Sequence, residues 1–198
     1  MEEQMSKSRE QVNDYLKRID IQDKIVLDVG VQDHPTSRLT KGKAAKYYTL
    51  DIDPQWNPDI VADLNNPATP EFVKSKKIPI DIIFCVEVLE HCWNPVRVVQ
   101  NLSVMLSPGG DVYITTPFIN PHHDVVDYLR FTNEWYRDVL PKVGLDVIEI
   151  VERVATVGRN LLMQFYTTEG LKVSKIRPEY GHYSCPIGYI VHAKRRLS

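Results

Sequence analysis

Short apolar runs alternate with longer amphipathic stretches along this chain. The run Ile25 to Gly30 is β-branched and almost unbroken, which is typical of a strand covered on both faces at the centre of a parallel sheet. It stops at Gly30, where the backbone can turn tightly beside a ligand. Similar apolar runs predict the other strands. The predicted strands are 24–30, 47–52, 60–64, 78–85, 111–115, 145–154 and a last one within 184–193.

Polar stretches with apolar residues at helical spacing lie between these runs and predict helices. Asn94 and Pro95 are typical of a helix start, and the run 107–110 ends that helix. Thr132 is placed to cap a later helix. The alternation of strands and helices implies parallel pairing, with ligands bound at the carboxyl ends of the strands. The predicted helices are 8–19, 70–74, one from 95, one after 132 and 160–166.

Length and composition predict one domain over residues 1–198, with residues 1–23 as an N-terminal segment whose helix caps the sheet. A chain with 43% apolar residues can bury one substantial core. The net charge of -2 gives no basic field, so we expect neither nucleic acid nor a membrane as a partner. Scattered cysteines, a charged amino terminus and the lack of a long apolar span predict a cytoplasmic protein.

Two acids end predicted strands and suggest a nucleoside site. Asp51 follows Gly30 by about twenty residues, where a nucleotide-binding α/β unit places a carboxylate that accepts both ribose hydroxyls. Asp63 ends the next strand and is placed to accept a hydrogen bond from an adenine amino group. An alternative for Asp63 is a surface loop acid or a helix cap. The sequence therefore predicts a nucleoside cofactor over the first two strands.

Four motifs support a family resemblance, and they occur in a fixed order. They are Val26–Gly30, Leu50–Asp53, Val88–His91 and Leu106–Gly110. Together they resemble the class I S-adenosylmethionine-dependent methyltransferases. The resemblance implies a Rossmann-like α/β fold: a mostly parallel seven-stranded sheet with helices on both faces and a reversed last strand. It also implies that S-adenosyl-L-methionine lies over the first, second and fourth strands.

The resemblance also assigns cofactor contacts by position. Asp28 and Gly30 would face the methionine part of the cofactor, and Asp51 would hold the ribose. The chain departs from the family in the first loop, where Gln32 and His34 stand in place of further glycines. The cofactor-binding residues expected on this basis are Asp28, Gly30, Asp51, Ile52, Asp63, Leu64, Cys85, Val86 and Glu87, of which the last three would lie near the sulfonium.

The spacing of Glu87, Glu90 and His91 raises the question of a metal. It resembles the Glu-x-x-Glu-His group that binds a divalent metal in ubiquinone-type O-methyltransferases and in small-RNA ribose methyltransferases. Mg²⁺ or Zn²⁺ held there would orient vicinal hydroxyls and lower the pKa of the attacking one. The alternative is a metal-free site, in which the glutamate caps a helix and the histidine lies beside the acceptor.

The acceptor is expected to contact segments 116–135 and 155–184. The first resembles the His-x-x-x-Asp-Tyr-x-Arg-Phe-Thr signature of a methyltransferase branch often associated with glycan or small-metabolite modification. His91 and His123 compete for the role of general base, because a hydroxyl nucleophile needs a base whose pKa is near neutrality. An internal ion pair between Asp127 and Arg130 is the alternative to a substrate contact. The expected substrate-binding residues are His122, Asp127, Tyr128 and Arg130.

The sequence as a whole predicts an S-adenosylmethionine-dependent enzyme that methylates an oxygen of a small hydroxylated metabolite or sugar. Transfer would proceed by in-line displacement at the sulfonium carbon. One alternative is an RNA methyltransferase, which would carry a positive surface around its pocket. Another is a cofactor-binding regulatory or scaffold subunit without catalysis. The sequence leaves homodimerisation open.

Overall fold

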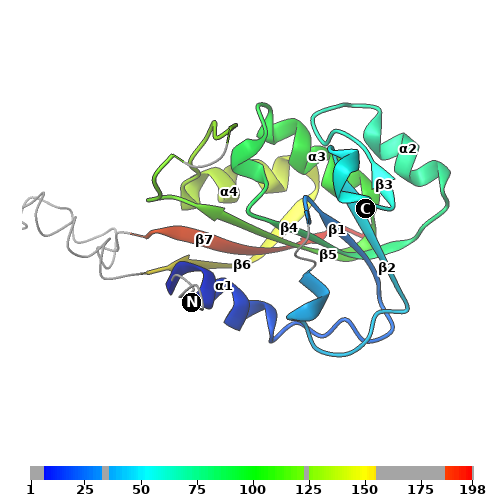
Figure 1. The fold of residues 1–198 in the computed structure, drawn as a ribbon, viewed down its shortest axis with the longest axis horizontal. Coiled ribbons are helices and arrows are strands. Elements are labelled where there is room, and N and C mark those ends of the chain that lie inside the picture. Colours follow the sequence, from blue (N-terminus) through cyan, green and yellow to red (C-terminus); the bar gives the residue numbers. More distant parts are fainter. Residues whose placement is uncertain (1–6, 33–35, 123–124, 155–185, 198) are drawn as a thin grey trace, which may run out of the picture.

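The protein forms one seven-stranded sheet with the strand order β3-β2-β1-β4-β5-β7-β6 (Figure 1). The structure is a computed structural model and describes residues 7–32, 36–122, 125–154 and 186–197. The neighbouring strands from β3 to β5 pair in parallel, whereas β7 is antiparallel to both β5 and β6. The predicted sheet with a reversed last strand is therefore confirmed. The strands are β1 Ile25–Val29, β2 Lys46–Asp51, β3 Ile60–Val61, β4 Ile80–Val86, β5 Leu106–Pro117, β6 Leu145–Arg153 and β7 Gly188–Arg195.

The apolar run that the sequence singles out forms an interior strand of the sheet, next to the middle strand β4. Val26, Leu27 and Val29 of β1 are buried, and β1 pairs with β2 on one side and β4 on the other. Strand β5 differs from the prediction, because it begins at Leu106 directly after a helix. Leu106 pairs with Ile80 and Asp111 with Ile82, so the residues 107–110, expected as a turn, form an irregularity within the strand.

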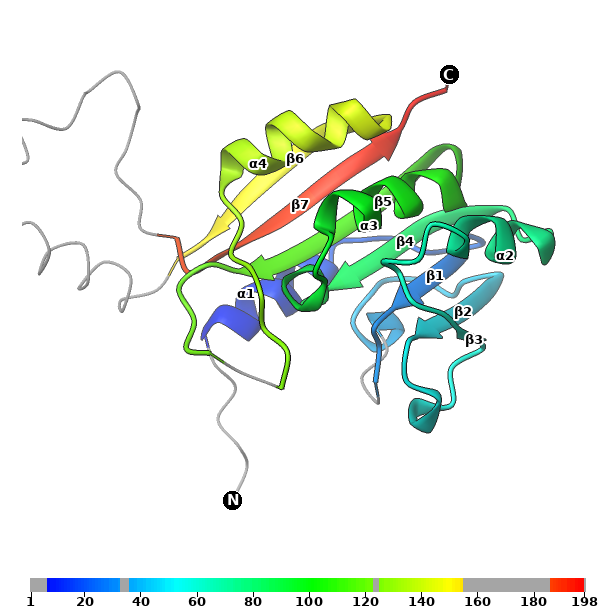
Figure 2. The ribbon, with the colours of Figure 1, turned by 90° about the horizontal axis from the view of Figure 1, so that it is seen from above.

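The two faces of the sheet are covered unequally (Figures 1 and 2). Three helices lie on one face over the larger core, and a single N-terminal helix lies on the other. Val12 and Leu16 of that helix pack in a smaller core with Phe84 of β4. Its Gln11 also bonds both backbone groups of Val154 after β6. The helices are α1 Lys7–Leu16, α2 Thr69–Ser75, α3 Pro95–Met105 and α4 Asn133–Val139.

The two predicted helix caps are confirmed. The side chain of Asn94 accepts a hydrogen bond from the backbone N–H of Arg97, and Thr132 accepts one from Trp135. The capping helix is shorter than predicted, and the expected helix 160–166 lies outside the described residues. Within the described ranges, every helix is too short or too polar to cross a lipid bilayer.

Candidate functional site

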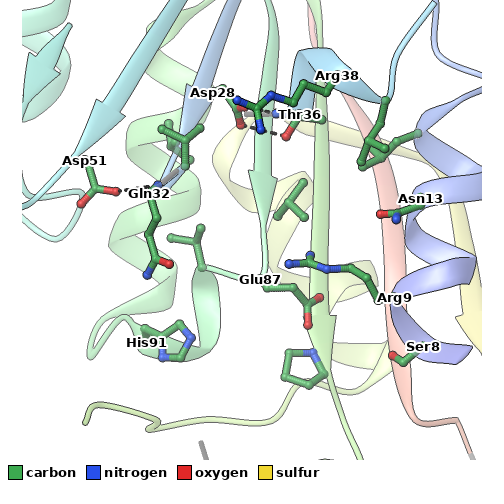
Figure 3. Close-up of a pocket in the computed structure, with 18 of the residues that line it drawn as sticks. Ser8, Arg9, Asn13, Asp28, Gln32, Thr36, Arg38, Asp51, Glu87 and His91 are labelled. Atoms are coloured by element: carbon green, nitrogen blue, oxygen red, sulfur yellow. Dashed lines mark hydrogen bonds between the residues drawn. The ribbon is translucent and has the colours of Figure 1, made fainter. Parts of the chain in front are cut away.

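A pocket of about 730 Å³ opens at the carboxyl ends of β1, β2 and β4 (Figure 3). Strand β1 is the point where the chain connections diverge toward opposite edges of the sheet, and such a point leaves a crevice for ligands. The other wall of the pocket is α1, which contributes Ser8, Arg9 and Asn13. Sequence reasoning missed this wall, because an amphipathic first helix carries no signal of a ligand on its polar face.

Gly30 shapes the floor of the pocket. Its φ is +67°, and its N–H donates a hydrogen bond of 2.8 Å to the carbonyl of Leu50. A Cβ atom at this position would lie 2.5 Å from a methyl carbon of Val88. The strand can therefore turn here over the end of β4 only because the residue is glycine.

Asp51 lies at the end of β2 on the pocket lining. Its two carboxylate oxygens accept hydrogen bonds from the backbone N–H groups of Asp53, at 2.9 Å, and Gln32, at 3.5 Å. These bonds fix the carboxylate beside the turn after Gly30, and Figure 3 shows it facing the pocket. The next residue, Ile52, also lines the pocket and is 64% exposed. Both positions suit a nucleoside, and their contacts with the cofactor stay predictions.

Asp28 lines the pocket too, but its carboxylate is only 1% exposed and fully engaged. It accepts hydrogen bonds from the N–H of Thr36 at 2.7 Å, from the Thr36 hydroxyl at 3.1 Å and from the Tyr47 hydroxyl. Burial raises the pKa of Asp28 to about 6, against the lowering effect of these bonds. Asp28 therefore fastens the turn at Thr36–Arg38 to β1 and shapes the pocket wall.

Three of the expected cofactor residues lie away from the pocket lining. Asp63 accepts hydrogen bonds from the backbone N–H and the side chain of Asn65, at 2.8 and 3.0 Å, as in the loop-acid alternative. Leu64 and Cys85 are buried in the larger core. Val86 and Glu87, by contrast, line the pocket. A cofactor contact for Asp63, Leu64 and Cys85 stays a prediction without geometric support.

An arginine that sequence reasoning missed holds the Glu87 carboxylate. Arg153 ends β6, is only 2% exposed, and places Nη2 3.1 Å from Glu87 Oε1. It also donates to the Thr116 carbonyl, and the Thr115 hydroxyl donates to Glu87 Oε1 at 2.7 Å. The arginine crosses Gly188 of β7, where a Cβ atom would lie 2.1 Å from Nη2. The pairing of a strand arginine with a glycine on the neighbouring strand could have revealed this contact. That pairing is visible only when the register of the two strands is known.

Glu90 is fully buried behind the pocket. Within the described residues, neither of its carboxyl oxygens has a hydrogen-bond partner. Burial raises the pKa of Glu90 to about 8, and the negative charge of Glu87 adds to the rise. The backbone carbonyl of Glu90 accepts bonds from the N–H groups of Tyr128 and Leu129. Glu90 therefore joins the end of β4 to the expected acceptor loop.

His91 lines the pocket and contacts the same loop. Its Nδ1 bonds the backbone carbonyl of Val126, and its Nε2 lies 3.8 Å from Glu90 Oε1. The described residues contain no group of three His, Cys, Asp or Glu side chains placed to hold a metal ion. Glu87 is committed to Arg153 and Thr115, and Glu90 is enclosed by protein. The arrangement therefore does not support the metal site that the spacing suggested.

The acceptor segment contains the internal ion pair given as an alternative. Arg130 donates to both carboxylate oxygens of Asp127, and its Nη2 also lies 3.5 Å from the Asn120 carbonyl. The paired carboxylate raises the pKa of Arg130. Tyr128 and His122 are exposed, whereas His123 and the segment 155–184 lie outside the described residues. A substrate contact of Arg130 or Asp127 would have to coexist with this pair.

The methyltransferase domain family is matched over residues 1–150. The chain belongs to the S-adenosylmethionine-dependent methyltransferase family. Among curated relatives, this methyltransferase chain is 26% identical over 140 residues to a ubiquinone biosynthesis O-methyltransferase of Aromatoleum aromaticum, covering 69% of the chain and 58% of the relative. A second such enzyme, from Azoarcus, is 25% identical over 118 residues, with 58% of the chain and 50% of the relative covered. The chain thus spans about half the length of the curated relatives it matches.

Solved structures share the fold. A methyltransferase of Haloferax volcanii, solved with the Trm112 activator, has a TM-score of 0.61 and 15% identity, covering 97% of this chain and 90% of that one. An S-adenosylmethionine-dependent methyltransferase of Mesorhizobium loti has a TM-score of 0.60 and 13% identity, covering 95% and 98%. The seven-stranded sheet of this methyltransferase domain is therefore the fold of these enzymes.

The pocket fits the cofactor of the family. Its volume lies in the range of small-molecule sites. It offers a carboxylate at the end of β2, an exposed apolar side chain beside it and charged groups toward α1. S-adenosylmethionine needs partners of these three kinds, for its ribose, its adenine and its charged amino-acid end.

Replacing Glu90 with glutamine should change how the stability of this methyltransferase domain depends on pH. The folded-state pKa of Glu90, about 8, is raised above its ordinary value of 4.5. Its contribution to stability is therefore fully present below pH 4.5 and is lost as the pH rises through 8. Glu90→Gln keeps the size of the side chain and cannot ionise. We expect its free energy of unfolding in urea to exceed that of the wild type by about 1–3 kcal/mol more at pH 8 than at pH 5.

The matched control is Glu71→Gln, which changes an exposed glutamate of α2. It should give the same difference from the wild type at both pH values. If the free energies of unfolding of Glu90→Gln and the wild type changed in parallel between pH 5 and pH 8, the pKa of Glu90 would be the same in the folded and unfolded chain. That result would contradict the prediction.

Proposed function

We propose that this chain transfers the methyl group of S-adenosylmethionine to an oxygen of a small hydroxylated molecule, such as a phenol or a sugar. The observation that carries the proposal is the pocket at the carboxyl ends of β1, β2 and β4, within a chain matched by the methyltransferase domain family. The O-methyltransferase names of its relatives support oxygen as the acceptor atom. The bound cofactor supplies an electrophilic methyl group on a sulfonium.

Different residues around the pocket suit different parts of the cofactor. Asp51 offers a carboxylate for two ribose hydroxyls, and Ile52 offers apolar contact beside it. Glu87, held by Arg153 and Thr115, keeps a negative charge beside the place where the sulfonium would lie. Positioning an acceptor oxygen in line with the methyl carbon then provides much of the rate acceleration.

His91 is the described residue best placed to take the acceptor proton. The Val126 carbonyl can only accept a hydrogen bond, so the Nδ1 that faces it carries the proton of a neutral imidazole. The other nitrogen, Nε2, is then the basic one. Glu90 Oε1 lies 3.8 Å from Nε2, but its carboxyl is protonated below its pKa of about 8, so near neutral pH it adds no negative charge beside the imidazolium.

Replacing His91 with alanine should lower kcat about 100-fold or more, because general bases contribute about that much. The dissociation constant of S-adenosylhomocysteine should change less than about threefold. The experiment uses labelled S-adenosylmethionine with a panel of phenolic and sugar acceptors, and it follows both methylated product and released S-adenosylhomocysteine. Lys142→Ala, which changes an exposed residue after α4 that lies outside the acceptor segment and the pocket lining, is the control and should keep the wild-type rate.

Each other outcome points to a different function. Label transferred to RNA and to no small acceptor would favour the RNA alternative. Binding of S-adenosylhomocysteine without turnover on any acceptor would favour the regulatory subunit. An unchanged rate in His91→Ala, with a large loss in His123→Ala, would move the role of base to the second histidine.

A further inference from the structure

Arg153 lies on the pocket lining at the end of the sheet that the antiparallel strands form. Gly188 of β7 pairs with Arg153 on one side and with Pro117 of β5 on the other, and Pro117 lines the same pocket. Strand β6 is one edge of the sheet, whereas Asp51 ends β2, next to the other edge. A cofactor lying over β1, β2 and β4 therefore leaves Arg153 on the side of the pocket that remains for the acceptor.

The guanidinium of Arg153 has donors that the protein does not use. Its Nη2 donates to the Thr116 carbonyl and contacts the Glu87 carboxylate. Its Nε is buried without a partner among the described residues, and its Nη1 donates to none of them. A guanidinium carries five N–H groups, and a buried donor without a partner destabilises the folded chain. Arg153 is only 2% exposed, so bulk water does not supply the missing acceptors.

A purely structural role accounts for Nη2 alone. A link from β6 to the ends of β4 and β5 needs only the contacts that this nitrogen makes. To hold a whole guanidinium there, β7 must have a glycine, because a Cβ atom at Gly188 would lie 2.1 Å from Nη2 and 2.3 Å from Nε. A glycine inside a strand weakens that strand. An acceptor atom of a bound ligand would use the remaining donors, and the structure of the empty pocket is then explained.

The charges on the acceptor side of the pocket also favour an anion. Arg153 and the sulfonium of a bound cofactor are two positive charges, whereas Glu87 supplies one negative charge. Burial raises the pKa of Glu90 to about 8, so its carboxyl is mostly neutral near pH 7. One positive charge is left without compensation. A ligand that carries a negative charge is therefore favoured over a neutral one of the same shape.

Resting on the proposed function, we propose that the methyl acceptor is an anion and that the Arg153 guanidinium binds its carboxylate or phosphate group. The contact is made by Nη1, because Nη2 is occupied by Thr116 and Glu87. Arg130, the arginine that the sequence suggested for the acceptor, is less suitable. It donates to both carboxylate oxygens of Asp127 and lies away from the pocket lining.

The test compares pairs of small hydroxylated molecules that differ in charge. The pairs are salicylate with salicylamide, glucuronate with glucuronamide, and glucose 6-phosphate with glucose. Each is titrated by calorimetry into the full chain saturated with sinefungin, a cofactor analogue in which a carbon bearing an ammonium group replaces the methylated sulfur. In the wild type, the anionic member of at least one pair should bind about tenfold to 100-fold more tightly than its neutral partner. The pair that responds distinguishes a carboxylate from a phosphate.

Variants of Arg153 then test whether this residue causes the preference. Arg153→Met should reduce it to less than about threefold, and Arg153→Lys, which keeps the charge without the planar group, should keep part of it. Because the loss of Arg153 also destabilises the fold, Arg153→Met combined with Glu87→Gln is measured as well and should show the same loss. Circular dichroism checks that each variant is folded. Arg137→Met, which changes an exposed arginine of α4, is the control and should keep the wild-type preference.

Three results would overturn the inference. The wild type could bind both members of every pair equally, or it could bind no anionic member at all. The anion preference could also persist in Arg153→Met and in the double variant, which would assign the anion to another group. None of these results contradicts the proposed function. That function would be contradicted instead if the folded wild-type chain failed to bind S-adenosylhomocysteine.

Discussion

Replacing Arg153 with methionine should lower the free energy of unfolding by about 2–4 kcal/mol, one of the largest effects expected of any single change in this chain. The substitution removes the guanidinium that pairs with Glu87 and donates to the Thr116 carbonyl. Methionine fills much of the same space, so the cost is chiefly electrostatic. Removing one partner of a buried ion pair leaves the other charge without compensation. Urea denaturation at neutral pH measures the change.

Two further variants separate the ion pair from other effects. Arg137→Met changes an exposed arginine of α4 that bonds Asn133, and it should cost less than about 0.5 kcal/mol. The double variant Arg153→Met with Glu87→Gln should be more stable than Arg153→Met alone, because the orphaned charge is gone. Equal stability of the single and double variants would mean that Glu87 is solvated without its partner.

Replacing Asp51 with asparagine should weaken S-adenosylhomocysteine by about 30- to 100-fold. The carboxylate can accept from two ribose hydroxyls at once, whereas the amide keeps one acceptor and turns a donor toward them. Calorimetry gives the dissociation constant, and the change should be as large for 5′-methylthioadenosine, since both ligands contain the ribose.

Asp59→Asn is the matched control for this change. Asp59 also accepts hydrogen bonds from a backbone N–H and a hydroxyl, both of Thr49, but it does not line the pocket. It should leave both affinities within about twofold. If Asp51→Asn bound both ligands as the wild type does, the ribose would lie elsewhere and the orientation of the cofactor in the pocket would have to be reversed.

The fold could be predicted almost completely, because its signals are local. The unbroken apolar run of β1 marks a strand with neighbours on both sides, and Thr132 and Asn94 mark helix starts by their own hydrogen bonds. The irregularity at 107–110 could not be seen, since proline and two glycines are equally typical of a turn. Only the pairing of Leu106 with Ile80 shows that the strand has already begun.

The site was harder to predict, because its contacts join segments far apart in the sequence. Asp51 could be placed on the pocket from its distance to Gly30 alone. Nothing around Asp28 in the sequence indicates that Tyr47 and Thr36 enclose it. Likewise, in the sequence Arg153 is only the polar last residue of a strand in which polar and apolar residues alternate. Its partner Glu87 lies 66 residues earlier. Residue types indicated the chemistry of the pocket, and only the register of distant strands showed which groups are available.

The N-terminal helix α1 contributes to both the smaller core and the pocket. The same ten residues close the smaller core with Val12 and Leu16 and form one wall of the pocket with Arg9 and Asn13. A ligand that contacts this wall therefore binds the folded chain, in which α1 packs against Phe84 and the sheet. Ligand binding and folding are therefore linked equilibria. A higher concentration of the ligand in a cell would raise the amount of folded chain.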